Sequence, residues 1–147
     1  MKKLVAICAL VALPIAISSC SSDDNSVIRK PDTYVGIWET DSLFYTFNGR
    51  EMKHRFNEMP GGDDAITKDI MTLTDDKATV IETNKKGVDQ SPIQGTIADK
   101  VITLTSTDPR HTPRTIKAAT DKKLTVEYNI DMRGAELPVT VTYNRLK

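Results

Sequence analysis

Along most of the chain, apolar residues recur at every second position, with polar residues between them. The stretch KLTVEYNID places Leu124, Val126, Tyr128 and Ile130 on one side of an extended backbone. This alternation indicates β-strands with one buried face, because successive side chains of a strand point to opposite faces of the sheet. The sequence therefore predicts an all-β domain. The expected strands cover residues 34–40, 43–48, 50–57, 66–74, 77–84, 92–98, 101–107, 114–119, 124–130 and 138–146.

Tight turns separate these strands and favour an antiparallel up-and-down meander. Asn48-Gly49 is the strongest turn signal, since both central residues of a type I′ hairpin turn adopt positive φ. A meander of many short strands protects its edges by closing into a barrel or folding into a sandwich. We expect a closed barrel of about eight to ten strands, with a β-sandwich as the alternative. The count is lower if the first two segments form one long bent strand.

The last expected strand provides a test of closure. In LPVTVTYNR the alternation sends Val139, Val141, Tyr143 and Arg145 to the inside of the barrel. In a closed meander the first strand, at residues 35–39, pairs with this last strand. Closure therefore brings the two ends of the domain side by side.

The beginning of the chain has a different pattern. Lys2 and Lys3 precede an almost unbroken apolar run from Leu4 to Ile17, interrupted by Pro14. A positive start followed by an apolar segment and small residues is typical of a secretory signal peptide. A membrane-spanning helix needs about 20 apolar residues, and this run is shorter. We therefore expect residues 1–19 to be a signal peptide.

The apolar run ends in ISSC, residues 17–20, which resembles the lipobox of bacterial lipoproteins. The resemblance implies that Cys20 is the mature terminus and carries acyl chains, such as palmitate, that attach it to a membrane. The following SSDDNS resembles the export signal of surface lipoproteins of the Bacteroidota, which implies the outer membrane and the cell surface. The alternatives are a plain signal peptide with an incidental cysteine and an ordinary solvated tether. We expect a flexible tether over residues 20–33 and a folded domain over residues 34–147.

The stretch YVGIWET contains Gly36 and Trp38, a pair similar to the Gly-x-Trp signature of lipocalins. With the lipobox and the strand pattern, it makes the chain resemble the lipocalin-like lipoproteins of Bacteroidota. The resemblance implies a lipocalin-like barrel over residues 34–147. It also implies that Trp38 closes one end and that Arg145 packs on its ring, a contact worth about 0.5–2 kcal/mol. The usual lipocalin disulfide is absent, because one cysteine remains after the signal peptide.

Charge and reactive side chains narrow the function further. The chain has 20 basic and 20 acidic residues, so no nucleic acid partner is expected, since nucleic acid binding requires concentrated positive charge. The sequence has no Gly-x-Ser-x-Gly motif, and His54 and His111 do not have metal-ligand spacing. We expect no enzyme activity, no cofactor and no metal. His111 lies on an expected turn, where it should be solvated, and GGDDAITKD is expected to form a turn rather than a cation loop.

Candidate ligand-lining residues lie at the alternating positions of several strands that are expected to point into the barrel, and the methionines among them suit irregular apolar ligands. They are Tyr45, Met52, His54, Met71 and Tyr128. A long loop expected at residues 57–65 is of the kind that often carries binding. The sequence thus predicts a non-enzymatic outer-membrane lipoprotein that binds a small, mostly apolar molecule or nutrient at the cell envelope. The alternative is a protein- or glycan-interaction module of a surface assembly, with these side chains filling the barrel as core.

Overall fold

The computed structural model describes residues 34–58, 61–132 and 135–146, and the expected signal peptide and tether lie outside them. The described strands are β1 (Gly36–Phe47), β2 (Arg50–Arg55), β3 (Ile66–Leu73), β4 (Lys77–Asn84), β5 (Ile93–Ala98), β6 (Val101–Leu104), β7 (Arg114–Ala119), β8 (Lys123–Met132) and β9 (Ala135–Arg145), with a short 3-10 helix η1 (Phe56–Glu58). The sequence pattern located all of these strands. The expected segments 34–40 and 43–48 form one strand, β1, and β6 is shorter than the expected 101–107.

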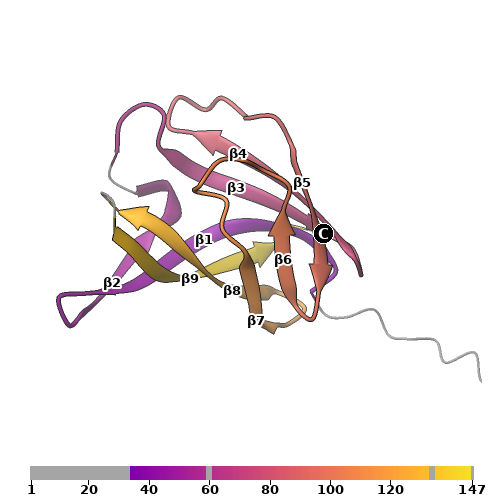
Figure 1. Ribbon diagram of the computed structural model, residues 1–147. Coiled ribbons are helices and arrows are strands. Elements are labelled where there is room, and N and C mark those ends of the chain that lie inside the picture. The colour runs from indigo at the N-terminus through magenta and orange to yellow at the C-terminus, as the bar shows by residue number, and fades with distance from the viewer. Residues whose placement is uncertain (1–33, 59–60, 133–134, 147) are drawn as a thin grey trace, which may run out of the picture.

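The strands form one antiparallel sheet that closes on itself. Their order is β2-β1-β3-β4-β5-β6-β7-β8-β9, and β1 also pairs with β9. This second pairing closes eight strands into a barrel and leaves β2 outside it (Figure 1). In its register Trp38 lies opposite Arg145, and Tyr45 lies opposite Val139. The predicted closure of the meander is therefore confirmed, and the sandwich alternative is wrong.

The two ends of the barrel are unlike. At the closed end, tight turns join β3 to β4, β5 to β6 and β7 to β8, and the chain enters β1 and leaves β9 there. At the other end, which we call the mouth, longer connections run over residues 56–65, 85–92 and 105–113. Long loops positioned by a rigid sheet are where binding sites commonly form. The mouth is therefore the end at which a site is expected.

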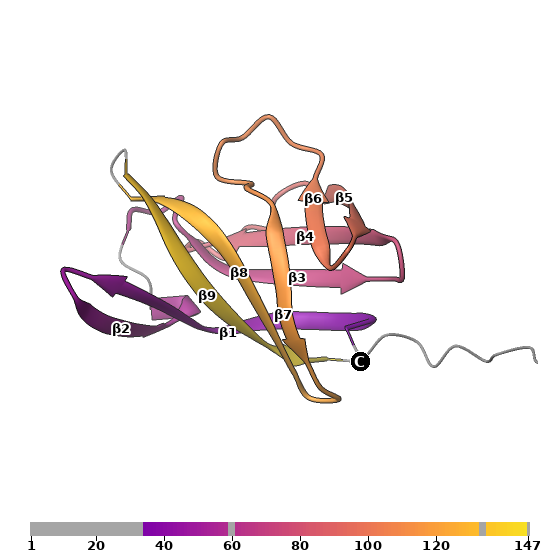
Figure 2. The ribbon, with the colours of Figure 1, turned by 60° about the horizontal axis from the view of Figure 1, so that its bottom comes forward.

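Strand β1 is bent and changes partner along its length. Its first part, Gly36–Glu39, pairs with β3, whereas Ser42–Phe47 pairs with β2. The register of β1 on β9 shifts between Thr40 and Ser42, as is typical of a β-bulge. The β1–β2 hairpin consequently projects beyond the barrel wall (Figure 2). The helix η1 then places Phe56, which is buried, into the core at the mouth.

Two backbone positions explain residues that the sequence singled out. Asn48 and Gly49 have φ of 50° and 74° at the tip of the β1–β2 hairpin, as the type I′ turn requires. Gly36 begins β1 with φ of 149°, a conformation that residues with a Cβ rarely adopt. The glycine of the Gly-x-Trp pair is therefore required by the backbone at the point where the chain enters the barrel.

The core at the closed end is centred on Trp38, which is fully buried. Its indole Nε1 donates a hydrogen bond to the carbonyl oxygen of Tyr34 at 2.7 Å. The guanidinium carbon of Arg145 lies 4.2 Å from the centre of the indole ring, so the expected cation–π contact is present. Arg145 Nη1 also donates to the carbonyl oxygen of Val35 at 2.8 Å. Together these contacts tie the entry of β1 to the exit of β9.

Candidate functional site

A group of charged side chains lies inside the barrel near the mouth. Arg114 on β7, Asp69 on β3 and Glu82 on β4 are all buried, with exposed fractions of 3%, 1% and 7%. Arg114 Nη1 donates to Asp69 Oδ2 at 2.9 Å and to the hydroxyl of Tyr143 at 3.3 Å. The Tyr143 hydroxyl in turn donates to Asp69 Oδ2 at 3.3 Å. We call these four residues the Arg114 cluster.

The Arg114 cluster contains one cation between two carboxylates. Arg114 Nη2 lies 3.7 Å from Glu82 Oε1, beyond hydrogen-bond distance but close enough for a strong attraction in a dry interior. The guanidinium also lies 4.8 Å from the ring centre of Tyr128, within the range of a cation–π contact. Arg114 thereby offsets part of the cost of burying both acids.

Burial governs the ionisation of these groups. It raises the pKa of the Asp69 carboxyl, and the attraction of Arg114 offsets this effect only in part. Burial also raises the pKa values of the Tyr128 and Tyr143 hydroxyls, so both stay protonated at neutral pH. For Arg114, burial alone disfavours the charge, but the surrounding tyrosines and acids raise its pKa on balance. The guanidinium therefore stays charged inside the barrel.

The sequence prediction missed the Arg114 cluster, although a signal was present. In ITKDIMTL, Asp69 lies on the same face of the strand as Met71 and Leu73, which are both buried in the core. Arg114 shares its phase with the buried Ile116 on β7. A charged residue in the apolar phase of a strand is placed inside by the pleat, where it needs a buried partner. This rule locates each member of the pair, although it does not identify which one faces which.

The prediction that His111 is solvated is wrong. Its side chain is 7% exposed, and its Nε2 lies 3.2 Å from Glu82 Oε1. The other ring nitrogen, Nδ1, lies 2.7 Å from the hydroxyl oxygen of Ser106. The next residue, Thr112, donates from its hydroxyl to the carbonyl oxygen of Asn129 at 2.7 Å. The connection between β6 and β7 is therefore fastened to β8 through Thr112, and it brings the His111 ring against Glu82 of β4.

A cavity of about 180 Å³ adjoins the Arg114 cluster, and we call it the inner cavity. Its lining is half polar and half apolar, and the residues are Asp69, Glu82, Arg110, Arg114, Phe56, Ile66, Tyr128 and Ile130. These residues come from the mouth ends of their strands, from η1 and from the β6–β7 connection. Arg110 is held there by Asp108, whose pKa is lowered to about 2, chiefly by its hydrogen bonds from Arg110.

The five predicted ligand-lining residues do not surround one cavity. Tyr128 lines the inner cavity, whereas Met71 is fully buried in the core with its sulfur 3.7 Å from Arg114 Nη1. Tyr45 and Met52 line a separate pocket on the β1–β2 hairpin. His54 stacks on Tyr45, with ring centres 5.7 Å apart and Nε2 3.2 Å from the tyrosine hydroxyl. The bend of β1 carries the hairpin residues away from the barrel interior.

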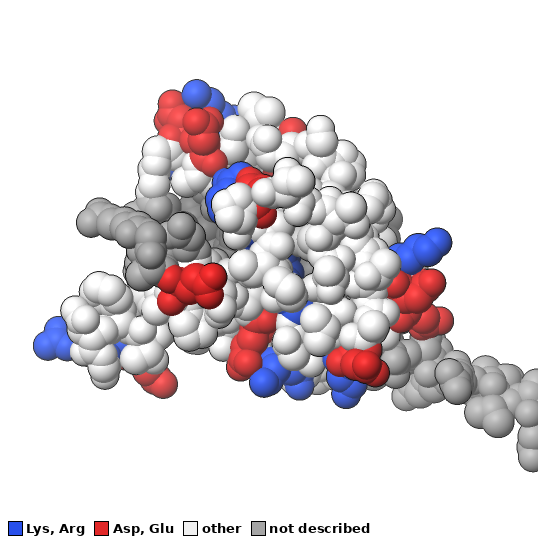
Figure 3. Space-filling view, in the orientation of Figure 1, with Lys and Arg blue, Asp and Glu red and all other residues white. Residues whose placement is uncertain are grey.

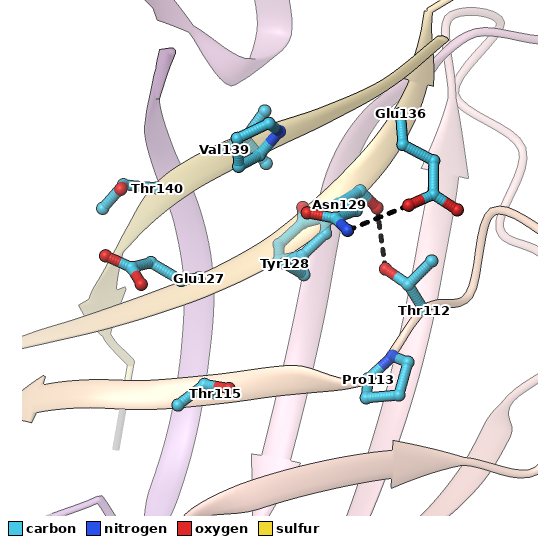
Figure 4. A pocket seen from close by; sticks show the side chains of 10 residues that line it. Thr112, Pro113, Thr115, Glu127, Tyr128, Asn129, Glu136, Val139 and Thr140 are labelled. Carbon is cyan, nitrogen blue, oxygen red and sulfur yellow. Dashed lines mark hydrogen bonds between the residues drawn. The ribbon is translucent and has the colours of Figure 1, made fainter. Parts of the chain in front are cut away.

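A larger, shallower groove of about 650 Å³ lies over β7, β8 and β9 (Figure 4). We call it the outer groove. Its lining includes the outward-facing side chains of Thr115, Glu127 and Thr140. Within it, Asn129 Nδ2 donates to Glu136 Oε2 at 3.1 Å. The outer groove presents hydroxyl, amide and carboxylate groups, in contrast to the partly apolar inner cavity.

The remaining surface carries a further pocket of about 480 Å³ with a strongly polar lining that includes Glu39, Asp41, Arg55 and Lys68. Acidic and basic side chains are interspersed on the face seen in Figure 3. Among the residues that the structure describes, no group of three or more histidine, cysteine or acidic side chains is arranged to hold a metal ion. No helix within the same residues has the length and apolar character needed to cross a membrane.

Comparison with known proteins gave matches in structure alone. No protein-family model matches the sequence, and no curated protein shows significant sequence similarity. One similar solved structure is the siderocalin Ex-FABP, described as functioning through dual ligand specificities. The match has a TM-score of 0.45 and 12% sequence identity, and it covers 77% of this chain and 70% of that chain. Another similar solved structure is apocrustacyanin C1, with a TM-score of 0.43 and 11% sequence identity. This match covers 82% of this chain and 64% of that chain. The match thus spans less than two thirds of apocrustacyanin C1.

Proposed function

We propose that the protein binds a small, mostly apolar molecule in the mouth of its barrel, without catalysing a reaction. The observation that carries this proposal is the inner cavity, which combines an apolar wall with a few convergent polar groups, as small-molecule sites usually do. Its charged residues are engaged in ion pairs within the barrel and its rim, with Arg114 on Asp69 and Arg110 on Asp108. Groups held in this way orient a ligand rather than exchange protons with it.

The size of the inner cavity limits what it holds. An engineered cavity of about 150 Å³ in another protein accepts benzene, and the inner cavity measures about 180 Å³. A single ring or a short alkyl segment therefore fits. A longer molecule would extend past Phe56 and Ile130 toward the mouth.

The proposal includes a location, which is inferred from the sequence. We propose that Cys20 is lipidated and anchors the protein in the outer membrane, with the domain at the cell surface. Replacing Cys20 with Ala should release the protein from the membrane fraction, and a variant that stays attached without acyl chains would refute the anchor. Cleavage of the domain by a protease added to intact cells tests the surface location, and complete protection of a cleavable loop argues for an inward-facing anchor.

The binding function is tested by mass spectrometry of the intact protein, purified gently from its membrane. We expect a copurified molecule, and we expect the Ile130→Trp variant to lose it, because the indole fills the inner cavity. Thr115→Trp, in the outer groove, is the matched control and should retain the molecule. A wild-type protein that never carries a small molecule, even after exposure to envelope extract, contradicts the proposal.

The outer groove favours a second candidate function, the recognition of a protein or glycan in a surface assembly. Threonine hydroxyls, Asn129 and the carboxylates of Glu127 and Glu136 offer the hydrogen-bonding groups that sugar hydroxyls or a peptide backbone require. In the test above, this function predicts the opposite outcome: Thr115→Trp removes the bound partner and Ile130→Trp retains it.

A further inference from the structure

Strand β2 has a free edge. It lies at one end of the strand order and pairs with β1, and no other described strand lies along its second edge. Figure 2 shows β2 in the hairpin that projects from the barrel. Closure gives each of the eight barrel strands a partner on both sides, whereas β2 keeps one edge without a described partner strand. Such an edge is a template on which another strand can pair.

The turn at the tip of the hairpin decides which backbone groups of β2 point to the free edge. In a two-residue hairpin the residues that flank the turn, here Phe47 and Arg50, form a hydrogen-bonded pair, and such pairs alternate along the two strands. Every second residue of β2, beginning with Arg50, therefore bonds to β1. The backbone N–H and C=O groups of Glu51, Lys53 and Arg55 point to the free edge, where they can pair with another strand.

Two side chains at this edge carry opposite charges that the hairpin does not pair. Glu51 and Lys53 are both exposed, and neither forms an ion pair with another described residue. Being two positions apart, they lie on the same face of the sheet. Charges on an edge strand usually discourage pairing with another chain. Here their signs alternate, so two antiparallel copies of β2 can set each acid opposite a base.

The other face of the hairpin offers an apolar contact at the same place. Tyr45 lies opposite Val139 of β9 on one side and opposite Met52 of β2 on the other, so the three side chains form one row across the sheet. Tyr45 and Met52 are half-buried, and the row ends at the free edge with Met52. A strand that sets an apolar side chain opposite Met52 continues the row and removes apolar surface from water.

One antiparallel register satisfies both faces, and the neighbouring registers do not. When Met52 lies opposite Met52 of a second copy, Glu51 lies opposite Lys53 on each side of it. Shifting one strand by two residues sets Lys53 opposite Lys53 in one direction and Glu51 opposite Glu51 in the other. Like charges that lie directly opposite each other destabilise a strand pair. The charge pattern therefore selects the register that also brings the two methionines together.

We propose that the free edge of β2 is a dimerisation surface, on which a second copy of this chain adds its own β2 antiparallel, with Met52 opposite Met52. The contact is isologous, so both copies use the same surface and no further edge is left open by it. Backbone hydrogen bonds join the two sheets into one, and the two Glu51–Lys53 pairs fix the register. The inference does not depend on the ligand-binding function or on the anchor proposed above.

Disulfide trapping in the full chain, purified in detergent, tests the register. Met52→Cys should give a crosslinked dimer under mild oxidation, because opposite residues of a non-hydrogen-bonded pair have Cα atoms about 4.5 Å apart, within the reach of a disulfide. Arg50→Cys is the matched control on the same face of β2. In this register its two copies lie about 13 Å apart along the strands, which is too far. We expect Met52→Cys to crosslink at least about tenfold faster, above the background that Cys8 and Cys20 give in the wild-type chain.

Exchange of charges tests what selects the register. Glu51→Lys or Lys53→Glu alone sets like charges opposite each other in both pairs, and should weaken dimerisation at least about tenfold in sedimentation measurements. Both substitutions in one chain restore opposite charges and should restore the dimer. An equimolar mixture of the two single variants should also pair. Lys122→Glu, at an exposed turn of the closed end, makes the same change of net charge and should have no effect.

Three outcomes overturn the inference. A Met52→Cys chain that crosslinks no faster than Arg50→Cys shows that the two edges do not meet in this way. Faster crosslinking of Lys53→Cys than of Met52→Cys shows a register with Lys53 opposite Lys53, in which the charges do not decide the pairing. Dimerisation that is unchanged in both Glu51→Lys and Lys53→Glu places the contact between copies on another surface.

Discussion

Replacing Arg114 with Met should destabilise the barrel by about 3–5 kcal/mol, the usual cost of removing one partner of a buried ion pair. Met keeps a long apolar side chain, so the loss comes from the charge. The substitution leaves Asp69 and Glu82, 1% and 7% exposed, as two buried acids without their shared cation. Asp69→Leu should cost less, because Arg114 then faces only Glu82, 3.7 Å away, and the formal charges of that pair balance.

The double variant Arg114→Met with Asp69→Leu should be more stable than the sum of the two single losses predicts. Residues in direct contact commonly couple by about 0.5–3 kcal/mol, and removing both partners leaves neither charge of this pair stranded. Acidification should reduce the deficit of Arg114→Met. The pKa of Asp69 is already raised by burial, so the folded state retains its proton to higher pH than the unfolded state does. Proton binding to Asp69 therefore stabilises the folded state at low pH, and this stabilisation is lost as the pH rises.

Urea unfolding followed by the fluorescence of Trp38, the single tryptophan, measures these losses. Lys117→Met is the matched control on the same strand, since Lys117 is 49% exposed and pairs with Glu127 on the surface at 3.0 Å. We expect it to cost at most about 1 kcal/mol. A loss below about 1 kcal/mol for Arg114→Met, or strict additivity in the double variant, would show that water reaches these acids and that the cluster is not a buried unit.

Four further predictions concern closure and pH. Trp38→Ala should lower the free energy of unfolding by about 3–5 kcal/mol, because it empties the core at the closed end. Arg145→Met should lower it by about 0.5–2 kcal/mol for the lost cation–π contact, and further for the lost hydrogen bond to Val35. Unchanged melting temperatures would contradict both predictions. Deleting residues 138–146 should unfold the whole domain, because it removes the strand that closes the barrel. In the intact protein, the backbone amides of the first and last strands should exchange slowly with solvent. A last strand that exchanges freely would argue against closure. Stability should fall as the pH rises above 10, because Tyr128 and Tyr143 keep in the folded state protons that the unfolded chain releases; a stability curve that stays flat there, with early tyrosinate absorbance, would contradict their burial.

The strands and the closure of the barrel could be predicted from the sequence because both depend on local patterns. Alternation of apolar residues places Val139, Val141 and Tyr143 inside, and all three are buried. The turn at Asn48-Gly49 depends on two adjacent residues whose backbone preferences are known. In each case the physical cause lies within a few residues of its effect.

The Arg114 cluster could not be predicted in the same way, because its contacts join distant parts of the chain. Asp69 and Arg114 are 45 positions apart, and the pairing depends on how the closed sheet brings β3 and β7 to opposite sides of one interior. Alternation indicates that each charge points inward, but it carries no information on which charges meet. His111 shows the same limit: DPRHTPR has the residues of a turn, and only the folded loop brings the imidazole to Glu82.

The entry of β1 and the exit of β9 lie together at the closed end, so the chain that precedes β1 joins the barrel opposite its mouth. If Cys20 carries the anchor proposed above, the chain up to Tyr34 reaches at most about 50 Å when extended. An anchor that joins the barrel at its closed end leaves the mouth free to face the medium. A ligand would then arrive from the aqueous side without crossing the headgroup layer. The protein would sample what diffuses past the cell rather than what is dissolved in the membrane.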